Sequence, residues 1–289
     1  MKNTRIAWIA LAVALLGLLL SWQGRLKPGV DSKTIDNTLL KIKRDRKLRV
    51  AYITYPPTVF RDPTTHELSG HFIDTLKEIL IQVDPKVTVE YEETTWADFA
   101  TALNSGRVDL SIAGTFTTIP RAKQVAFTRP LVYLGRSVII RKGDRRFSAS
   151  NGPMQFDRSD VRVGVVDGEG SYEFVKANFK NQSKVTTFSG TDLTQCLAAV
   201  SSGQVDVGMS DAMEVSKYAK AHPGEVEDLF ADNPYDITPV GWSVRQEDFV
   251  WKGFLDTAIQ TLETQGKLIG YEHKYDYKWI HPIIDFKIQ

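Results

Sequence analysis

One short pattern occurs twice in this chain, and this repeat constrains the fold more than any other feature of the sequence. Residues 104–114 read NSGRVDLSIAG, and residues 201–211 read SSGQVDVGMSD. Each copy has a small polar pair, a glycine, a polar residue and then Val-Asp. A glycine after an apolar periodic segment is typical of a helix end, and the apolar run after it begins a strand. Each copy is therefore predicted to join a helix to the following strand.

The segments around the two copies alternate in the same way. In the first half, strands are predicted at 48–53, 86–93 and 108–114, with helices at 66–83 and 94–106. Thr95 is the expected N-cap of the second helix, and Gly106 ends it. In the second half, strands are predicted at 161–166, 184–188 and 205–211, with helices at 171–179 and 191–203. This β-α-β-α-β order favours two α/β lobes, each with a parallel sheet.

Two apolar stretches, 130–144 and 236–245, link the halves and predict a two-strand hinge. An amphipathic helix follows, with its apolar residues between Trp251 and Leu262, and is expected to return to the first lobe. The predicted first lobe comprises residues 47–134 and 240–285, and the second comprises residues 135–239. Because ligands bind at the carboxyl ends of strands in open α/β sheets, we expect a site in the cleft between the lobes.

The N-terminus indicates export. Lys2 and Arg5 precede an uncharged apolar run from Ile6 to Trp22. Residues 1–25 are therefore predicted to be a signal peptide or a membrane anchor, formed as a hydrophobic helix, and residues 26–46 a tether. Cleavage and anchoring both remain open, but in either case the rest of the chain lies outside the cytoplasm, in the periplasm or an equivalent space.

Composition excludes several classes of function. The net charge of +1 gives no basic field for nucleic acid. A single cysteine, Cys196, excludes an intrachain disulfide, and its helical surroundings predict a small buried side chain. The 5 histidines form no closely spaced metal pair, and phosphate-loop and Gly-x-Ser-x-Gly motifs are absent. The sequence predicts neither a metal nor a cofactor.

Several segments together resemble the bacterial extracellular solute-binding proteins of family 3, the polar amino-acid-binding proteins with a type II periplasmic binding fold. These segments are GTFTTIPRAKQVAFTRPLVYLG, LSGHFIDTLKEI, WADFATALNSGRVD, SSGQVDVGMSDAMEV and GWSVRQED. The resemblance runs from Leu48 to about Pro282. It implies an exported, monomeric binding protein whose two lobes close on an amino acid or related organic acid. An ABC-type permease would then take up the ligand.

The resemblance also implies ligand-binding residues. Arg121 matches the arginine that clamps the ligand α-carboxylate, a role that suits the planar fork of a guanidinium. Asp211 matches the acid that pairs with the α-ammonium, and it is equally well placed to be the N-cap of a helix. Tyr55 and Trp96 match aromatic residues that cover the ligand side chain, although Trp96 also suits a hydrophobic core.

Further candidates lie in two turns. Thr115 and Thr117 supply hydroxyls beside the ligand, and the turn with Gly168, Gly170 and Ser171 offers backbone N–H groups to an anion. Two positions depart from the family pattern: Phe116 stands where many relatives have Ser or Thr, and Gly170 where many have a second hydroxyl. These departures predict a weaker hold on the charged groups of an α-amino acid.

Two alternative functions stay open. The segment SDAMEVSKYAKAHPG resembles the cyclohexadienyl dehydratases, a catalytic branch of the same fold that acts on prephenate and arogenate. Glu214 would then be the proton donor, with its pKa raised by an apolar pocket, although the segment GEGS departs from that branch. The third possibility is a membrane-anchored ligand-sensing module.

Overall fold

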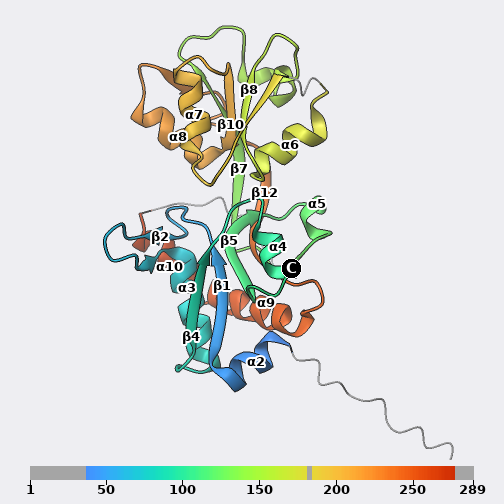
Figure 1. Cartoon of the computed structure of the whole chain (residues 1–289). Helices are drawn as coiled ribbons and strands as arrows, with labels where there is room; N and C mark the ends of the chain where they lie inside the picture. The colour runs from blue at the N-terminus through green and yellow to red at the C-terminus, as the bar shows by residue number, and fades with distance from the viewer. Residues whose placement is uncertain (1–36, 181–183, 277–289) are drawn as a thin grey trace, which may run out of the picture. The chain divides into compact units, whose positions relative to one another are not determined.

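The computed structural model describes residues 37–180 and 184–276 (Figure 1). The predicted signal peptide or anchor lies outside the described residues, as do most of the tether and the last part of the predicted first lobe. Among the helices that are described, none combines the length and the apolar character that a membrane crossing requires.

The described chain alternates helices and strands. The helices are α2 (Thr38–Asp45), α3 (His71–Val83), α4 (Phe99–Asn104), α5 (Ile119–Ala122), α6 (Gly170–Asn178), α7 (Thr194–Ser201), α8 (Ala212–Ala221), α9 (Phe249–Thr264) and α10 (Lys267–Lys274). The strands are β1 (Lys47–Tyr52), β2 (Phe60–Arg61), β3 (Leu68–Ser69), β4 (Thr88–Glu93), β5 (Leu110–Phe116), β6 (Ala126–Phe127), β7 (Val132–Arg141), β8 (Val163–Val166), β9 (Val185–Phe188), β10 (Val207–Asp211), β11 (Val226–Asp228) and β12 (Tyr235–Val244). Two short 3-10 turns cover Ala149–Asn151 and Pro153–Phe156.

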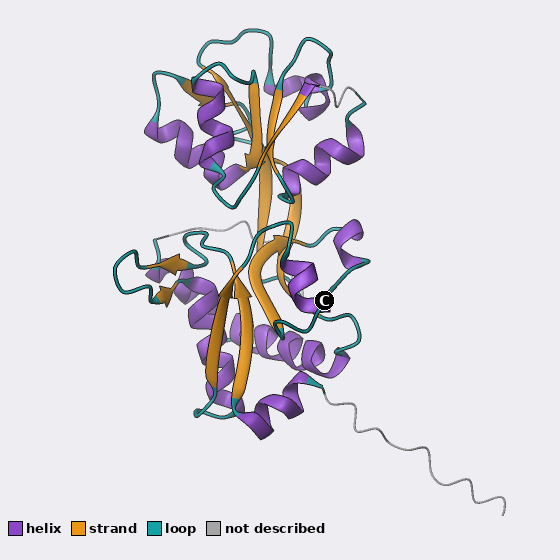
Figure 2. Ribbon diagram, viewed as in Figure 1, coloured by secondary structure: helices purple, strands orange, loops and turns teal. Residues whose placement is uncertain are grey.

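The sheet has the same arrangement at its two ends. The strand order is β4-β1-β5-β12-β7-β10-β8-β9. β1 lies between β4 and β5 with parallel pairing, and β8 lies between β9 and β10 with parallel pairing. Helices flank both groups of strands (Figure 2). The predicted pair of β-α-β-α-β lobes is confirmed.

Two long strands connect the lobes. β7 and β12 pair antiparallel, with an irregular register between Tyr235 and Thr238. Each then joins one lobe, because β12 pairs with β5 and β7 pairs with β10. This is the predicted two-strand hinge, and Figure 1 shows both strands running between the lobes.

The repeated pattern has a structural explanation on each side. Gly106 and Gly203 adopt φ of 72° and 77° just after α4 and α7, the left-handed backbone in which glycine ends a helix. The aspartate of each copy is buried against an arginine. Asp109 accepts hydrogen bonds from the backbone and side chain of Arg49, and Asp206 does the same with Arg162.

Each of these aspartates ties together several elements of its lobe. Asp109 also pairs with Lys41 of α2, and Asp206 also pairs with Arg141 of β7. Burial alone would raise the pKa of each carboxyl, but the hydrogen bonds from the arginines outweigh it and lower both pKa values. Both aspartates are therefore charged at neutral pH.

Each lobe has its own hydrophobic core. The first is built on β1, α3, β5 and α9, with Phe72, Trp242 and Trp251 fully buried. The prediction that the amphipathic helix returns to the first lobe is therefore correct. Ile42 of α2, within the predicted tether, is buried in this core too. The second core packs β7, β8 and β10 against α6, and Cys196 is buried in α7 as expected.

The start of α4 was predicted incorrectly. The helix begins at Phe99, with Asp98 as its N-cap and no side-chain hydrogen bond to cap it. Thr95 instead closes the preceding turn, where its hydroxyl accepts a hydrogen bond from the Asp98 N–H at 3.2 Å. Trp96 lies in this turn and is therefore not part of α4.

Candidate functional site

A small cavity lies where the two lobes meet. Its lining residues come from both lobes: Tyr55, Trp96, Gly114, Phe116, Arg121 and Leu134 on one side, and Glu169, Gly170, Leu193 and Asp211 on the other. Its volume is about 20 Å³, which is room for about one water molecule. The predicted residues Arg121, Asp211, Tyr55, Trp96 and Gly170 are thus brought together around one cavity.

Arg121 stands in α5 and is buried, with 3% of its surface exposed. The Thr118 hydroxyl, as N-cap, holds the backbone of this short helix by accepting from the Arg121 N–H. The guanidinium donates to the Phe116 carbonyl at 3.1 Å and, across the cleft, to Glu173 Oε1 at 2.9 Å and to the Gly168 carbonyl. Burial lowers the pKa of Arg121, and the Glu173 charge opposes this shift.

Asp211 ends β10 and begins α8. Its Oδ1 accepts from the backbone N–H groups of Met213 and Glu214, both at 3.0 Å, so the N-cap role predicted for it is confirmed. The Tyr55 hydroxyl lies close enough to this carboxylate to favour its charged form. Burial, followed by the charge of Glu169, raises the pKa of Asp211 to about 6. Asp211 therefore titrates near neutrality.

Two aromatic rings of the first lobe are in contact at the cavity. Tyr55 and Trp96 pack edge to face, with ring centroids 5.9 Å apart. Tyr55 is held by backbone pairing with Val59, and Trp96 by the turn before α4. Trp96 is 7% exposed, and its Nε1 has no hydrogen-bond partner within the described part of the chain.

The lobes touch closely at two glycines of the second lobe. A Cβ atom added to Gly170 would lie 2.2 Å from Phe116 Cδ2, and one added to Gly168 would lie 2.5 Å from the Ala97 backbone nitrogen. No side chain larger than hydrogen fits at either position in this arrangement. A ligand larger than water therefore enters this cavity only when the cleft is wider, which movement about β7 and β12 can supply.

The other predicted ligand residues do not line this cavity. Thr115 is buried in β5, and the Thr117 hydroxyl donates to the Pro239 carbonyl. The Gly168 carbonyl accepts from Arg121, and the Ser171 N–H donates to Glu169 Oε2 at 2.7 Å. One N–H of the turn expected to hold an anion, that of Ser171, thus already binds a carboxylate of the chain itself.

Three charged residues of the cleft were not predicted from the sequence. Glu169 lines the cavity with 4% of its surface exposed, and Glu173 pairs with Arg121. Arg136 of β7 lies over the Phe116 ring, 4.5 Å from its centroid, and pairs with Asp236. The sequence offers little signal for Glu169, because it stands three positions after the last residue of β8 and glutamate is not among the preferred N-cap residues.

Glu214, the catalytic candidate of the dehydratase alternative, is 6% exposed and lies 3.5 Å from Lys217. Burial, followed by the charge of Asp211, raises the pKa of its carboxyl. It does not line the cavity. Within residues 37–180 and 184–276, no group of three or more histidine, cysteine, aspartate or glutamate side chains could hold a metal ion.

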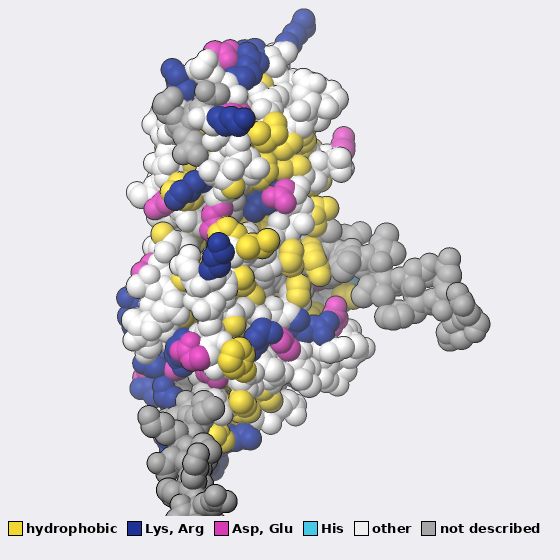
Figure 3. Space-filling model, turned by 90° about the vertical axis from the view of Figure 1, so that its right-hand side faces the viewer, with side chains coloured by type: hydrophobic (Ala, Val, Ile, Leu, Met, Phe, Trp, Pro, Cys, Tyr) yellow, Lys and Arg dark blue, Asp and Glu magenta, His cyan; other side chains and the backbone are white. Residues whose placement is uncertain are grey.

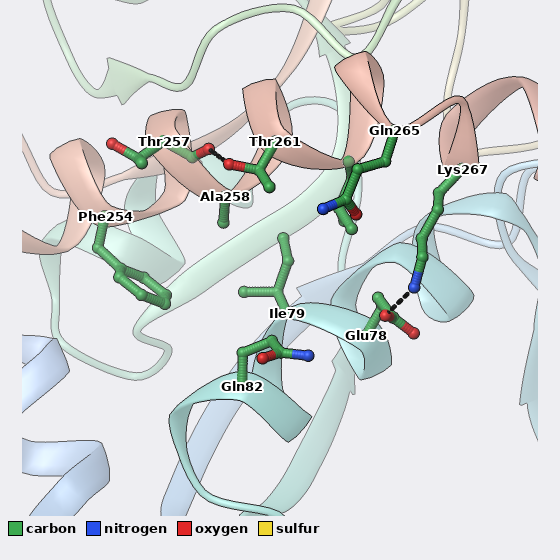
Figure 4. A pocket seen from close by; sticks show the side chains of 10 residues that line it. Glu78, Ile79, Gln82, Phe254, Thr257, Ala258, Thr261, Gln265 and Lys267 are labelled. Carbon is green, nitrogen blue, oxygen red and sulfur yellow. Dashed lines mark hydrogen bonds and ion pairs between the residues drawn. The ribbon is translucent and has the colours of Figure 1, made fainter.

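Larger hollows lie elsewhere on the first lobe. One of about 450 Å³ lies between α3 and α9, with Glu78, Ile79 and Phe254 among its lining residues (Figure 4). Another of about 710 Å³ lies between α5 and the start of α9 and includes Thr117. On the face of the molecule shown in Figure 3, exposed hydrophobic side chains lie among charged ones. Neither hollow shares a lining residue with the cavity between the lobes.

Comparisons with known proteins agree with the fold. The model of the bacterial extracellular solute-binding proteins, family 3, matches residues 48–278. A cyclohexadienyl dehydratase from Pseudomonas aeruginosa is 24% identical over 84% of this chain and 88% of its own. A putative ABC transporter arginine-binding protein 2 from Escherichia coli is 24% identical over 78% and 87% of the two chains. Among solved structures, an ancestral arginine-binding protein bound to arginine matches with a TM-score of 0.66 and 26% identity, over 79% and 97% of the two chains.

Proposed function

Since the chain belongs to family 3 of the bacterial extracellular solute-binding proteins, we propose that it captures a free amino acid in the cleft between its lobes. The observation that carries this proposal is the pair of opposite charges at one cavity. Arg121 comes from the first lobe and Asp211 from the second. An α-amino acid presents a carboxylate and an ammonium group, and these two side chains are complementary to them.

Each side chain is prepared for its role. The Arg121 guanidinium faces the cavity, and its N–H groups beyond those bound to Phe116, Gly168 and Glu173 are left for a ligand carboxylate. The Asp211 carboxylate is held in one orientation by the N-terminus of α8. Tyr55 and Trp96 would cover the ligand side chain, as their places beside the cavity suggest.

The wider role follows from the family and the N-terminus. We propose that the chain works outside the cytoplasm as a monomer and delivers its ligand to an ABC-type permease. Relatives named as binding proteins of ABC transporters, such as the putative arginine-binding protein 2 of Escherichia coli, support this proposal. The apolar run from Ile6 to Trp22 would direct export and, if uncleaved, would hold the protein at the membrane.

A thermal-shift screen tests the proposal. The full chain, purified in detergent because of its apolar N-terminal segment, is mixed with each of the common amino acids and with small organic acids. A ligand at about 100 times its Kd stabilises the native state by about 2.7 kcal/mol, so a true ligand raises the Tm measurably. If no amino acid changes the Tm, the proposed function is wrong.

A dehydratase is the second candidate, and the buried carboxyl of Glu214 with its raised pKa favours it, as does similarity to the Pseudomonas enzyme. A carboxyl group that holds its proton at higher pH can act as a general acid. Incubation with prephenate or arogenate tests this activity through the ultraviolet absorbance of the aromatic product. Turnover that disappears in Glu214→Gln would favour the enzyme over the binding protein.

A further inference from the structure

The cavity contains a second carboxylate beside Asp211. Glu169 follows β8, caps the N-terminus of α6 through Oε2, and lines the same cavity. β8 and β10 are neighbouring parallel strands, so Glu169 and Asp211 lie at adjacent carboxyl ends of the same sheet. Because both belong to the second lobe, their spacing is kept whether the lobes are open or closed.

The positive charges of the cleft are already paired with other acids. Arg121 pairs with Glu173, and Arg136 pairs with Asp236. For Glu169 and Asp211, by contrast, no cationic group of the described chain lies within ion-pair distance. The second lobe therefore presents two buried carboxylates with one oxygen each bound to a helix N-terminus. The charges of Arg136 and Arg121 act on Glu169 from nearby, but within the described chain neither carboxylate forms an ion pair with a cation.

The rest of the lining suits a positively charged ligand. Tyr55 and Trp96 place aromatic rings at the cavity, and aromatic faces attract ammonium and guanidinium groups. Independently, Trp96 Nε1 is buried and has no hydrogen-bond partner within the described part of the chain, so it offers a donor to a ligand acceptor such as a carboxylate. The lining thus offers a hydrogen-bond donor to one acceptor group of a ligand, and it offers carboxylates and aromatic rings to more than one cationic group.

We propose that the cleft selects amino acids with a cationic side chain, with the α-ammonium at Asp211 and the side-chain ammonium or guanidinium at Glu169. This inference rests on the proposed capture of an amino acid and names its class. Glu169 is then the residue that distinguishes basic from neutral amino acids. A neutral ligand would leave the buried Glu169 carboxylate without a cationic partner, and this costs affinity.

Isothermal titration of the full chain in detergent with arginine and with citrulline, its neutral near-isostere, tests the inference. Wild type should bind arginine at least about tenfold more tightly, as expected for a charge-assisted hydrogen bond. Glu169→Gln should bring the two affinities to within about twofold, because its amide can still cap α6 but carries no charge. Glu169→Asp, which keeps the charge, should retain a preference for arginine. Glu247→Gln, at an exposed position, is the matched control and should behave as wild type.

Each outcome decides between the two proposals. Equal binding of arginine and citrulline by wild type would overturn the selectivity and leave amino-acid capture intact. An unchanged preference in Glu169→Gln, with the Tm showing a folded protein, would overturn the role of Glu169. Absence of binding by every amino acid would overturn both proposals.

Discussion

The contact between Phe116 and Gly170 makes a direct test of lobe closure possible. In Gly170→Ala, the new Cβ would lie 2.2 Å from Phe116 Cδ2 and 3.0 Å from an Arg136 nitrogen. Carbon atoms in contact prefer about 3.5–4.0 Å, so the closed arrangement is overpacked. Such overpacking costs about 1–3 kcal/mol, and the ratio of open to closed molecules should rise by about 5- to 150-fold. Gly170 begins α6 without a positive φ, so alanine does not strain the helix itself.

Pulsed electron paramagnetic resonance between spin labels on the two lobes measures this ratio. Ile81→Cys and Met154→Cys are exposed labelling sites on the first and second lobes. Burial raises the pKa of Cys196 to about 12, so the native thiol should stay unlabelled. Gly170→Ala should shift the distances toward longer values.

Two companion variants identify the cause of the shift. Gly253→Ala, with open space around its added Cβ, should leave the distances unchanged. Adding Phe116→Ala to Gly170→Ala removes the clashing ring and should restore the short distances. A Gly170→Ala protein with the wild-type distance distribution would refute the reasoning.

Three further predictions concern charged residues. Arg121→Ala should weaken amino-acid binding at least about tenfold in titration calorimetry, because a stranded ligand carboxylate costs about 2–5 kcal/mol; an unchanged Kd would remove Arg121 from the site. With a pKa of about 6 for Asp211, affinity for a cationic ligand should fall about tenfold between pH 7 and pH 5, and Asp211→Asn should abolish this slope. Asp109→Asn should lower the free energy of unfolding by about 1–2 kcal/mol in urea, discounted for the partial exposure of Arg49. Because the Asp109 pKa is lowered in the folded protein, the contribution of Asp109 to stability is complete above the unfolded pKa of about 4. This contribution is lost as the pH falls further, through the folded pKa. Equal stabilities of wild type and Asp109→Asn at pH 7 would contradict this prediction.

The repeat predicted the architecture correctly because it depends on interactions between residues that are close in the sequence. A glycine that must end a helix and an apolar run that must enter a strand act within a few residues. The buried role of Asp109 was missed, since its partner Arg49 belongs to a strand some sixty positions earlier in the chain. Pairing across strands depends on the assembled sheet, which no local pattern contains.

The charged residues of the cleft also divide into those that could be predicted and those that depend on the assembled fold. The resemblance to the family 3 solute-binding proteins implied both Arg121 and Asp211, and the structure brings them to one cavity. The partnership of Arg121 with Glu173 depends on how closely the lobes approach, and Glu169 reads as part of an ordinary turn until α6 is seen to begin there. The start of α4 was wrong because Thr95 caps a turn, and the same hydroxyl serves a turn or a helix equally well.

The capture of an amino acid between Arg121 and Asp211 is best tested by a crystal structure with the amino acid that gives the largest thermal shift. We expect the ligand between the lobes, with its carboxylate about 2.7–3.2 Å from the Arg121 guanidinium and its α-ammonium on Asp211. A ligand bound elsewhere, or one in the cleft whose carboxylate does not contact Arg121, would contradict it.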